Sequence, residues 1–201
     1  MVEFAGRNDE ERGTLDTVDH VAADALDAGL PLIVAAPRDE GTVMLIAVRP
    51  DVGEREILTE ATLDPGEGVI GDMWSRRPSK STPDGSPHPE MQVTLMNSRV
   101  AALLAGETDR WALAGDQIYV DLDLSEGNLP AGTRLGVGSA VLEVTGHPHT
   151  GCQKFSQRFG VEALRFVNSP SGREMRLRGM NTRVVTAGVV RVGDRVHKLA
   201  D

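Results

Sequence analysis

The chain of 201 residues has one cysteine, few aromatic residues and no long apolar run. A single cysteine, Cys152, cannot form a disulfide within the chain, so a disulfide-stapled secreted scaffold is excluded and a cytoplasmic location is favoured. No segment approaches the roughly 20 apolar residues of a membrane-spanning helix. The first twelve residues are polar and acidic, unlike a signal peptide. We therefore expect a cytoplasmic protein with no membrane partner.

Positive charge is also scarce. The sequence has 21 Lys and Arg against 30 Asp and Glu, a net charge of −9, which argues against nucleic acid as a partner because phosphate binding needs a basic surface. The charge is nevertheless uneven, since residues 147–199 hold ten basic and three acidic side chains. This asymmetry predicts an anion pocket around Cys152. The alternative is that the basic side chains spread over the folded surface.

Hydrophobic spacing predicts one helix near the N-terminus and short strands after it. Residues 16–29 carry apolar side chains at helical spacing, with Asp16 as the N-cap and with Gly29 and Pro31 as the stop. From residue 42 onward, short apolar runs alternate with turn residues, a pattern typical of a β-barrel or sandwich. The glycine-containing loop at residues 186–188 predicts a hairpin between its flanking strands.

Two further features read as loops and turns. Residues 75–90 contain four prolines and four serines without apolar periodicity, which predicts a long surface loop, with a mobile lid as the alternative. Gly-Asp pairs occur at residues 71–72, 115–116 and 193–194, and their simplest interpretation is turn chemistry. The sequence has no GxGxxG, P-loop or HExxH pattern, so it indicates none of the sites that these motifs form.

The segment around Cys152 is the richest in reactive side chains. His149, Lys154 and Arg158 flank the cysteine, and cationic neighbours favour the reactive thiolate. A buried, inert cysteine is the alternative. Together with His147 and His149, Cys152 could also supply three ligands to a catalytic zinc ion. A cysteine–histidine hydrolase with either histidine as base is a further interpretation.

Ordered motifs across residues 41–199 resemble the MOSC domain family, which is named for the C-terminal part of molybdenum-cofactor sulfurases. No single motif is specific to this family, but the order of all the motifs along the chain is specific to it. The matching segments are residues 63–72, 115–124, 132–135, 141–145, Cys152, 158–160, 178–179, 183–184 and 190–194.

The resemblance implies a mainly β fold. It predicts a MOSC-type β-barrel, similar to the barrel domain of pyruvate kinase, with a few short helices and an N-terminal helical extension. We expect residues 1–40 to form the extension with one helix and residues 41–201 to form the barrel domain.

The resemblance also implies that Cys152 is the family's cysteine, which carries sulfur as a persulfide or ligates molybdenum. Cys152 is then the predicted catalytic residue and metal ligand, and the predicted cofactor is the molybdenum cofactor, molybdopterin. The side chains expected to bind this cofactor are His149, Lys154, Arg158, Arg173, Arg178 and Arg183.

The expected partners follow from the same resemblance. Residues 1–40 are too few for a pyridoxal-phosphate-dependent desulfurase domain, so pyridoxal phosphate is not expected in this chain. Sulfur would come from a cysteine desulfurase or another donor, and a molybdoenzyme or a redox partner is a further expected partner.

Two alternative functions stay open. One is a molybdenum-dependent reductase of N-hydroxylated compounds with a separate redox partner, and the other is a non-catalytic binding module. Residues 121–123 read Asp-Leu-Asp where the hydroxylaminopurine-resistance proteins have an Asn-Leu-Thr type segment, which counts against the reductase.

A functional Cys152 requires a particular setting. We expect it to be reachable by solvent at the end of the predicted strand at residues 140–145. We also expect Arg158 close to it, with at least two of four other basic residues in the same cleft. Those four are Lys154, Arg173, Arg178 and Arg183.

Overall fold

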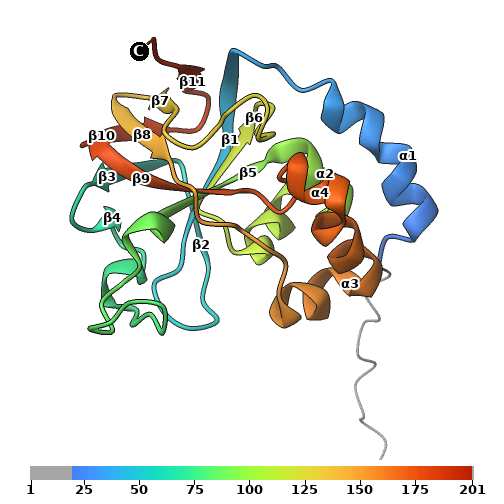
Figure 1. The fold of residues 1–201 in the computed structure, drawn as a ribbon, viewed down its shortest axis with the longest axis horizontal. Coiled ribbons are helices and arrows are strands. Elements are labelled where there is room, and N and C mark those ends of the chain that lie inside the picture. Colours follow the sequence, from blue (N-terminus) through green and yellow to red (C-terminus); the bar gives the residue numbers. More distant parts are fainter. Residues whose placement is uncertain (1–19, 201) are drawn as a thin grey trace, which may run out of the picture.

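Seven strands close into a barrel in the computed structural model, which describes residues 20–200 (Figure 1). The strands are β1 (Glu40–Val48), β5 (Val93–Asn97), β6 (Ile118–Asp121), β7 (Arg134–Val137), β8 (Ala140–Val144), β9 (Met180–Thr186) and β11 (Arg195–Lys198). Their order around the barrel is β11, β7, β8, β9, β5, β6 and β1, and the pairing of β1 with β11 closes the ring. Only β5 and β6 pair in parallel among these described strands. The predicted MOSC-type barrel is confirmed.

Aliphatic side chains fill the barrel. Along β8 the residues alternate between buried and half-buried, so Ala140, Leu142 and Val144 point inward. Val, Leu and Ile from the other strands complete this interior. The barrel therefore needs no aromatic residues in its core, in agreement with a composition that has 3 % of them.

A small second sheet lies beside the barrel. It consists of β10 (Gly188–Arg191), β3 (Glu60–Asp64) and β4 (Gly68–Val69), while β2 (Glu56–Leu58) extends the barrel sheet from β1. The predicted hairpin around residues 186–188 is wrong, because β9 pairs with β5 and β8 whereas β10 pairs with β3. The chain crosses between the two sheets at Gly188. A Cβ there would lie 2.5 Å from the backbone of Ser139, so a larger residue would not fit at this crossing.

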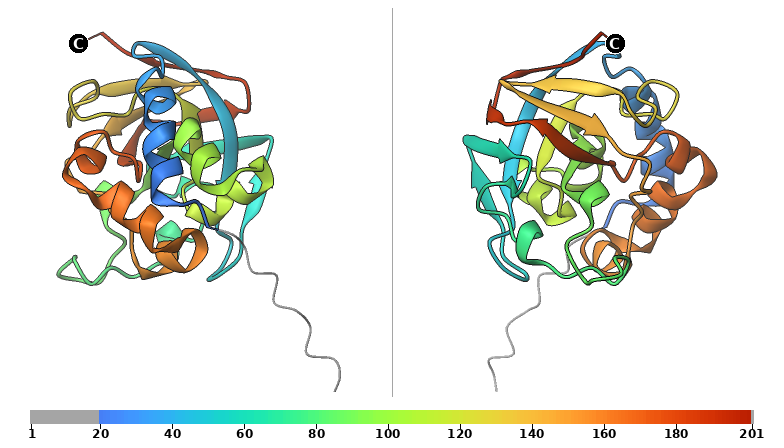
Figure 2. Two further views of the ribbon diagram at one scale, coloured as in Figure 1. Left: turned by 90° about the vertical axis from the view of Figure 1, so that its right-hand side faces the viewer. Right: turned by 60° about the vertical axis from the view of Figure 1, so that its left-hand side comes forward.

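The helices gather on the opposite side of the barrel from this small sheet (Figure 1). They are α1 (Ala23–Val34), α2 (Ser98–Ala105), α3 (Gln153–Asn168) and α4 (Pro170–Glu174), and the 3₁₀ turn η3 (Thr108–Ala114) lies with them. The 3₁₀ turns η1 (Trp74–Arg76) and η2 (Pro89–Met91) instead contact β4 and β9. Figure 2 shows α1 lying across α2 and α3. Buried side chains of these helices form a second core against the outer side of the barrel at Leu45, Met96 and Tyr119. Among residues 20–200, no helix has the length and hydrophobicity to cross a bilayer.

Helix α1 extends further than predicted. The expected stop at Gly29 and Pro31 is wrong, because the helix continues to Val34 with Pro31 inside it. Burial of Leu26 and Ile33 in the helical core compensates for the backbone hydrogen bond that proline cannot donate. The predicted N-cap, Asp16, lies outside the described residues. The domain division at residues 40 and 41 stays a prediction.

Candidate functional site

Cys152 ends the loop that leads from β8 into α3. It occupies the N-cap position of the helix with extended backbone angles, and its exposed side chain makes no capping hydrogen bond. The preceding Gly151 is fixed by Asn168, whose side chain accepts from the Gly151 N–H at 2.9 Å and donates to its carbonyl at 3.1 Å. A Cβ at Gly151 would lie 2.7 Å from Leu164. The expectation that the thiol is reachable by solvent is confirmed.

The motif after Cys152 shapes the start of the helix. Phe155 and Phe159 are buried with ring centroids 5.0 Å apart, which anchors one face of the helix in the core. Gly160 has φ of +90° and interrupts the helical backbone, and a Cβ there would meet His20 at 2.9 Å. The Arg158 guanidinium donates to the Leu113 carbonyl at 2.5 Å.

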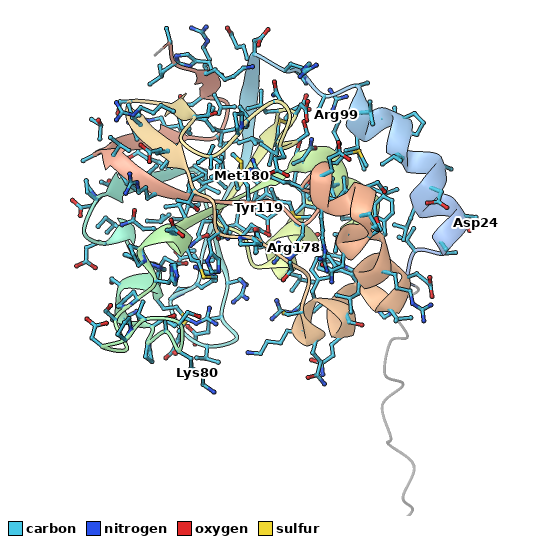
Figure 3. The ribbon with its side chains drawn as sticks, in the orientation of Figure 1. Asp24, Lys80, Arg99, Tyr119, Arg178 and Met180 are labelled. Atoms are coloured by element: carbon cyan, nitrogen blue, oxygen red, sulfur yellow. The ribbon has the colours of Figure 1, made fainter. Side chains whose placement is uncertain are left out.

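A buried ion pair lies close to this segment. Arg178 Nη1 donates to Asp116 Oδ2 at 2.6 Å, and the Asp116 side chain is fully buried. The Arg178 guanidinium also lies 5.0 Å from the centroid of Phe155, in α3. Figure 3 shows Arg178 in the interior, between the strands and the helices. The Gly-Asp pair at residues 115–116 therefore supplies a buried charge as well as a turn.

His149 packs against the same carboxylate. Its Nδ1 atom lies 3.5 Å from Asp116 Oδ1, and only 13 % of its side chain is exposed. Burial, followed by the positive charge of Arg178, lowers the pKa of His149 to about 3, although Asp116 acts in the opposite direction. His149 is therefore neutral near pH 7, and one of its ring nitrogens keeps a free lone pair.

We expect this depressed pKa to make the protein sensitive to acid. The unfolded chain takes up a proton on His149 near the ordinary pKa of 6.5, whereas the folded chain does so only near 3. The free energy of unfolding should therefore fall as the pH drops below about 6.5, by up to about 1.4 kcal/mol per pH unit from this group. Urea unfolding of wild type and His149→Gln at several pH values measures this contribution. Parallel pH profiles for the two proteins would contradict it.

Arginine side chains also surround the end of η3. Four consecutive backbone carbonyls there each accept a hydrogen bond from a different guanidinium. The pairs are Arg55 with Ala112 at 3.2 Å, Arg158 with Leu113 at 2.5 Å, Arg178 with Ala114 at 2.8 Å and Arg49 with Gly115 at 3.2 Å. Burial, and then the nearby charges of Arg158 and Arg49, lower the pKa of Arg55.

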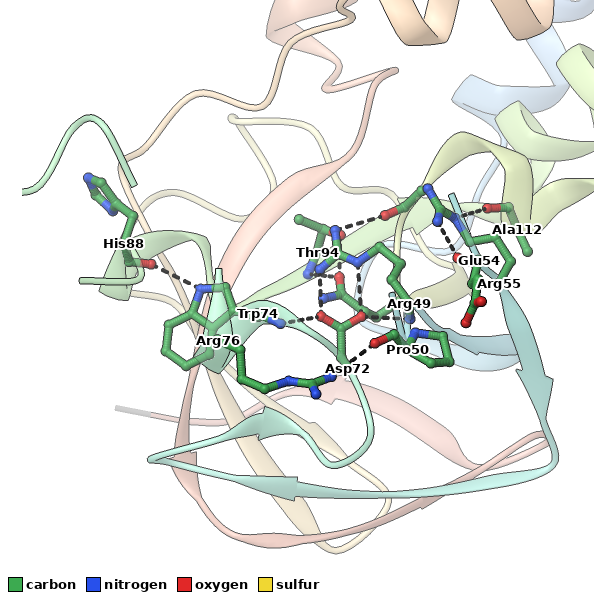
Figure 4. A network of polar contacts seen from close by, with 12 residues as sticks. Arg49, Pro50, Glu54, Arg55, Asp72, Trp74, Arg76, His88, Thr94 and Ala112 are labelled. Atoms are coloured by element: carbon green, nitrogen blue, oxygen red, sulfur yellow. Dashed lines mark hydrogen bonds and ion pairs between the residues drawn. The ribbon is translucent and has the colours of Figure 1, made fainter. Parts of the chain in front are cut away.

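A second buried carboxylate holds one of these arginines. Asp72 accepts from Nε and Nη2 of Arg49 at 2.9 and 2.8 Å, and also from the backbone N–H groups of Arg49 and Trp74 (Figure 4). Asp72 belongs to the Gly-Asp pair at residues 71–72. With Asp72 and Asp116 against four arginines, this region keeps an excess of positive charge that suits an anionic ligand.

A cavity of about 410 Å³ opens beside this cluster. Its lining includes the loop residues 145–150, Arg173 and Glu174 of α4, Arg176 and Glu126, and Asn181 of β9. Within residues 20–200, the buried polar atoms without a hydrogen-bond partner include His149 Nδ1, Arg178 Nε, Asp116 Oδ1 and Asn181 Oδ1. His149 and Asn181 line the cavity directly. These donors and acceptors fit a polar ligand.

The structure places the predicted binding residues in four different surroundings. His149 and Arg173 line the cavity, and Arg178 and Arg158 belong to the arginine cluster beside it. Lys154 is exposed on the first turn of α3. Arg183 is not brought to the cluster by any contact in the described part of the chain. It faces Glu143 across β8 and β9 and donates to that carboxylate at 2.6 Å.

The sequence predicts one cleft that holds Cys152, Arg158 and at least two of Lys154, Arg173, Arg178 and Arg183. The cavity in the described residues does not meet this expectation, because neither Cys152 nor Arg158 lines it. Of the four, only Arg173 lines it within the described range. The reason is that Arg178 is drawn inward by Asp116 and Arg183 outward by Glu143.

Sequence reasoning also missed four residues of the cluster: Arg49, Arg55, Asp72 and Asp116. The two arginines lie outside the basic segment. The aspartates belong to Gly-Asp pairs that read as turns and fall in the family-like segments 63–72 and 115–124, and these pairs were the available signal.

The zinc interpretation also changes. Within the described residues 20–200, His147, His149 and Cys152 do not come together as one set of metal ligands. His147 instead lies with His88 and Glu90.

Comparison with known proteins gives a family match and several similar folds. The sequence model of the MOSC domain matches residues 85–197, more than half of the chain. The crystal structure of YuaD from Bacillus subtilis is 17 % identical and has a TM-score of 0.59, covering 80 % of this chain and 97 % of that one. No curated protein sequence matches the chain.

Two YiiM crystal structures are also similar. YiiM from Escherichia coli is 15 % identical with a TM-score of 0.52, and the match covers 80 % of this chain and 70 % of that one. YiiM from Geobacillus stearothermophilus is 14 % identical with a TM-score of 0.53, covering 80 % and 75 %. At these identities the likeness concerns the fold.

Proposed function

The chain belongs to the MOSC domain family, and from that premise we propose that Cys152 serves as the ligand or the sulfur carrier for a molybdenum–pterin species. The family is associated with the molybdenum cofactor. One observation carries the proposal for this chain. Cys152 has an exposed thiol two residues after the loop that lines a polar cavity, at the start of the helix whose Arg158 belongs to the arginine cluster.

Basic side chains in and beside the cavity could pair with the anionic part of such a cofactor, while Glu126 and Glu174 also line the cavity. Arg173 lines the cavity and could pair with a phosphate through charge-assisted hydrogen bonds. Within residues 20–200, Arg178 Nε is a buried donor without a partner, and Asn181 Oδ1 is a buried acceptor without one. His149 is neutral near pH 7, so it adds a hydrogen-bonding group without adding a charge. When bound, the cofactor would supply a molybdenum centre, for which thiolate sulfur is a soft ligand.

The sulfur-carrier role uses the same thiolate. Cys152 would attack the outer sulfur of a persulfide on a donor protein, so that a new sulfur–sulfur bond forms on Cys152 as the donor's bond breaks. The donor cysteine leaves as a thiolate, and no external oxidant or reductant is needed. The exposed position of Cys152 at the start of α3 leaves room for a donor protein to approach.

Mass spectrometry of intact protein tests this role. After anaerobic incubation with a cysteine desulfurase and free cysteine, wild type should gain the mass of one sulfur atom, and Cys152→Ser should gain none. Gln153→Ala, which changes the exposed neighbour, should behave as wild type. The melting temperature of Cys152→Ser should stay within about 2 °C of wild type, because the side chain is exposed. A wild-type thiol that reacts with iodoacetamide but never gains sulfur would contradict the carrier role.

A further inference from the structure

A second cluster of potential metal ligands lies outside the Cys152 site. The donor atoms of His88, Glu90 and His147 lie within 4.8 Å of one another. The two imidazole rings are 4.5 Å apart between centroids and are tilted by 50°. His88 and Glu90 flank the start of η2, whereas His147 belongs to the loop after β8. The fold thus brings two separate segments together at these three side chains.

Hydrogen bonds from neighbouring side chains fix the backbone of all three residues. Each of the three backbone carbonyls accepts from a different side chain outside the cluster. The donors are Trp74 Nε1 to His88 at 3.3 Å (Figure 4), Thr145 Oγ1 to Glu90 at 2.7 Å and Asn181 Nδ2 to His147 at 3.0 Å. These hydrogen bonds hold the backbone from which the three side chains project.

We propose that His88, Glu90 and His147 form a binding site for a divalent transition-metal ion, with zinc the best match. Imidazole nitrogen with one carboxylate suits zinc, whereas magnesium and calcium prefer ligand sets made of oxygen. Three protein ligands leave a fourth tetrahedral position for water or another ligand. The site does not depend on the role of Cys152.

Binding requires a small contraction of the cluster. Tetrahedral zinc holds nitrogen and oxygen ligands roughly 3.4 Å apart, so the widest separation must close by about an ångström or slightly more. His88 Nδ1 accepts a hydrogen bond of 3.2 Å from the Glu90 N–H. The ion replaces this long contact, because Nδ1 either binds the metal or carries the proton while Nε2 binds it.

The position of the site suggests what the ion does. His147 lines the cavity of the candidate functional site, and His88 and Glu90 lie at the end of the proline-rich segment of residues 75–90. A bound ion therefore ties that segment to the wall of the cavity. Metal occupancy would fix the position of the segment next to the cavity.

Titration of metal-free protein with zinc chloride tests the proposal. Calorimetry should show one ion per chain for wild type, and affinity should fall at least about tenfold in His88→Ala, His147→Ala and Glu90→Gln. Exposed His20 provides the matched control, so His20→Ala should bind as wild type. Cys152→Ser should also bind as wild type, which separates this site from the proposed function.

Thermal melting gives a second measurement that detects misfolding. Without zinc, the variants of the three ligand residues should melt close to wild type, and a given zinc concentration should raise the melting temperature of wild type, His20→Ala and Cys152→Ser more than that of the ligand variants. Absence of stoichiometric binding, binding that survives His88→Ala and His147→Ala, or binding lost in Cys152→Ser would each overturn the proposal.

Discussion

Replacement of Arg178 by methionine should destabilise the protein by about 3–5 kcal/mol, because it leaves the buried carboxylate of Asp116 without its counter-ion. The Arg178 side chain is 8 % exposed and that of Asp116 fully buried, so water cannot take the place of the guanidinium. The variant also loses the hydrogen bond from Arg178 to the Ala114 carbonyl. Urea denaturation measures the change in the free energy of unfolding.

Arg183→Met provides the matched control. Arg183 also pairs with a carboxylate, that of Glu143, but its side chain is 54 % exposed. Its replacement should cost less than about 1 kcal/mol. The double variant Asp116→Asn/Arg178→Met should lose less than the sum of its single variants, because both charges are removed. A cost at Arg178 no larger than at Arg183 would contradict a charged, buried pair.

Asp72→Ala should have an effect of similar size, about 3–5 kcal/mol. The change removes the acceptor for two guanidinium nitrogens of Arg49 and for two backbone N–H groups (Figure 4). Arg49 then keeps a charge that is only 15 % exposed and has lost its partner. Glu60→Ala, which breaks an exposed pair with Arg191, should cost less than about 1 kcal/mol. Equal urea midpoints for the two variants would show that Asp72 does not anchor Arg49.

Much of the fold could be predicted because it depends on local patterns. The alternation of apolar and polar residues from Ile118 to Ser125 predicts a half-buried strand. A strand, β6, does form at its start, but it ends at Asp121 and is buried on both faces, because Tyr119 packs into the helical core. Pairing between distant segments leaves no such local pattern. The loop at residues 186–188 has the composition of a hairpin turn, yet its flanking strands belong to different sheets. Pro31 also reads as a stop, although the packing of Ile33 keeps α1 helical beyond it.

The candidate site shows the same division. A cysteine between basic residues and histidines could be singled out from the sequence, and its exposure agrees with that prediction. Net charge could not distinguish Arg178, which a buried aspartate draws inward, from Arg183, which Glu143 on the neighbouring strand holds at the surface. Arg49 and Arg55 could not be found at all, because only the folded chain brings them to the carbonyls of η3.

The molybdenum and pterin content of anaerobically purified protein tests the central claim most directly. The protein would be produced in cells that make the molybdenum cofactor, with wild type, Cys152→Ser and Gln153→Ala purified in parallel. We expect molybdenum and pterin together in wild type and in Gln153→Ala, and loss of the molybdenum from Cys152→Ser at an unchanged melting temperature. Wild type without molybdenum, pterin or extra sulfur on Cys152, or a Cys152→Ser variant that retains the full metal content, would contradict the account.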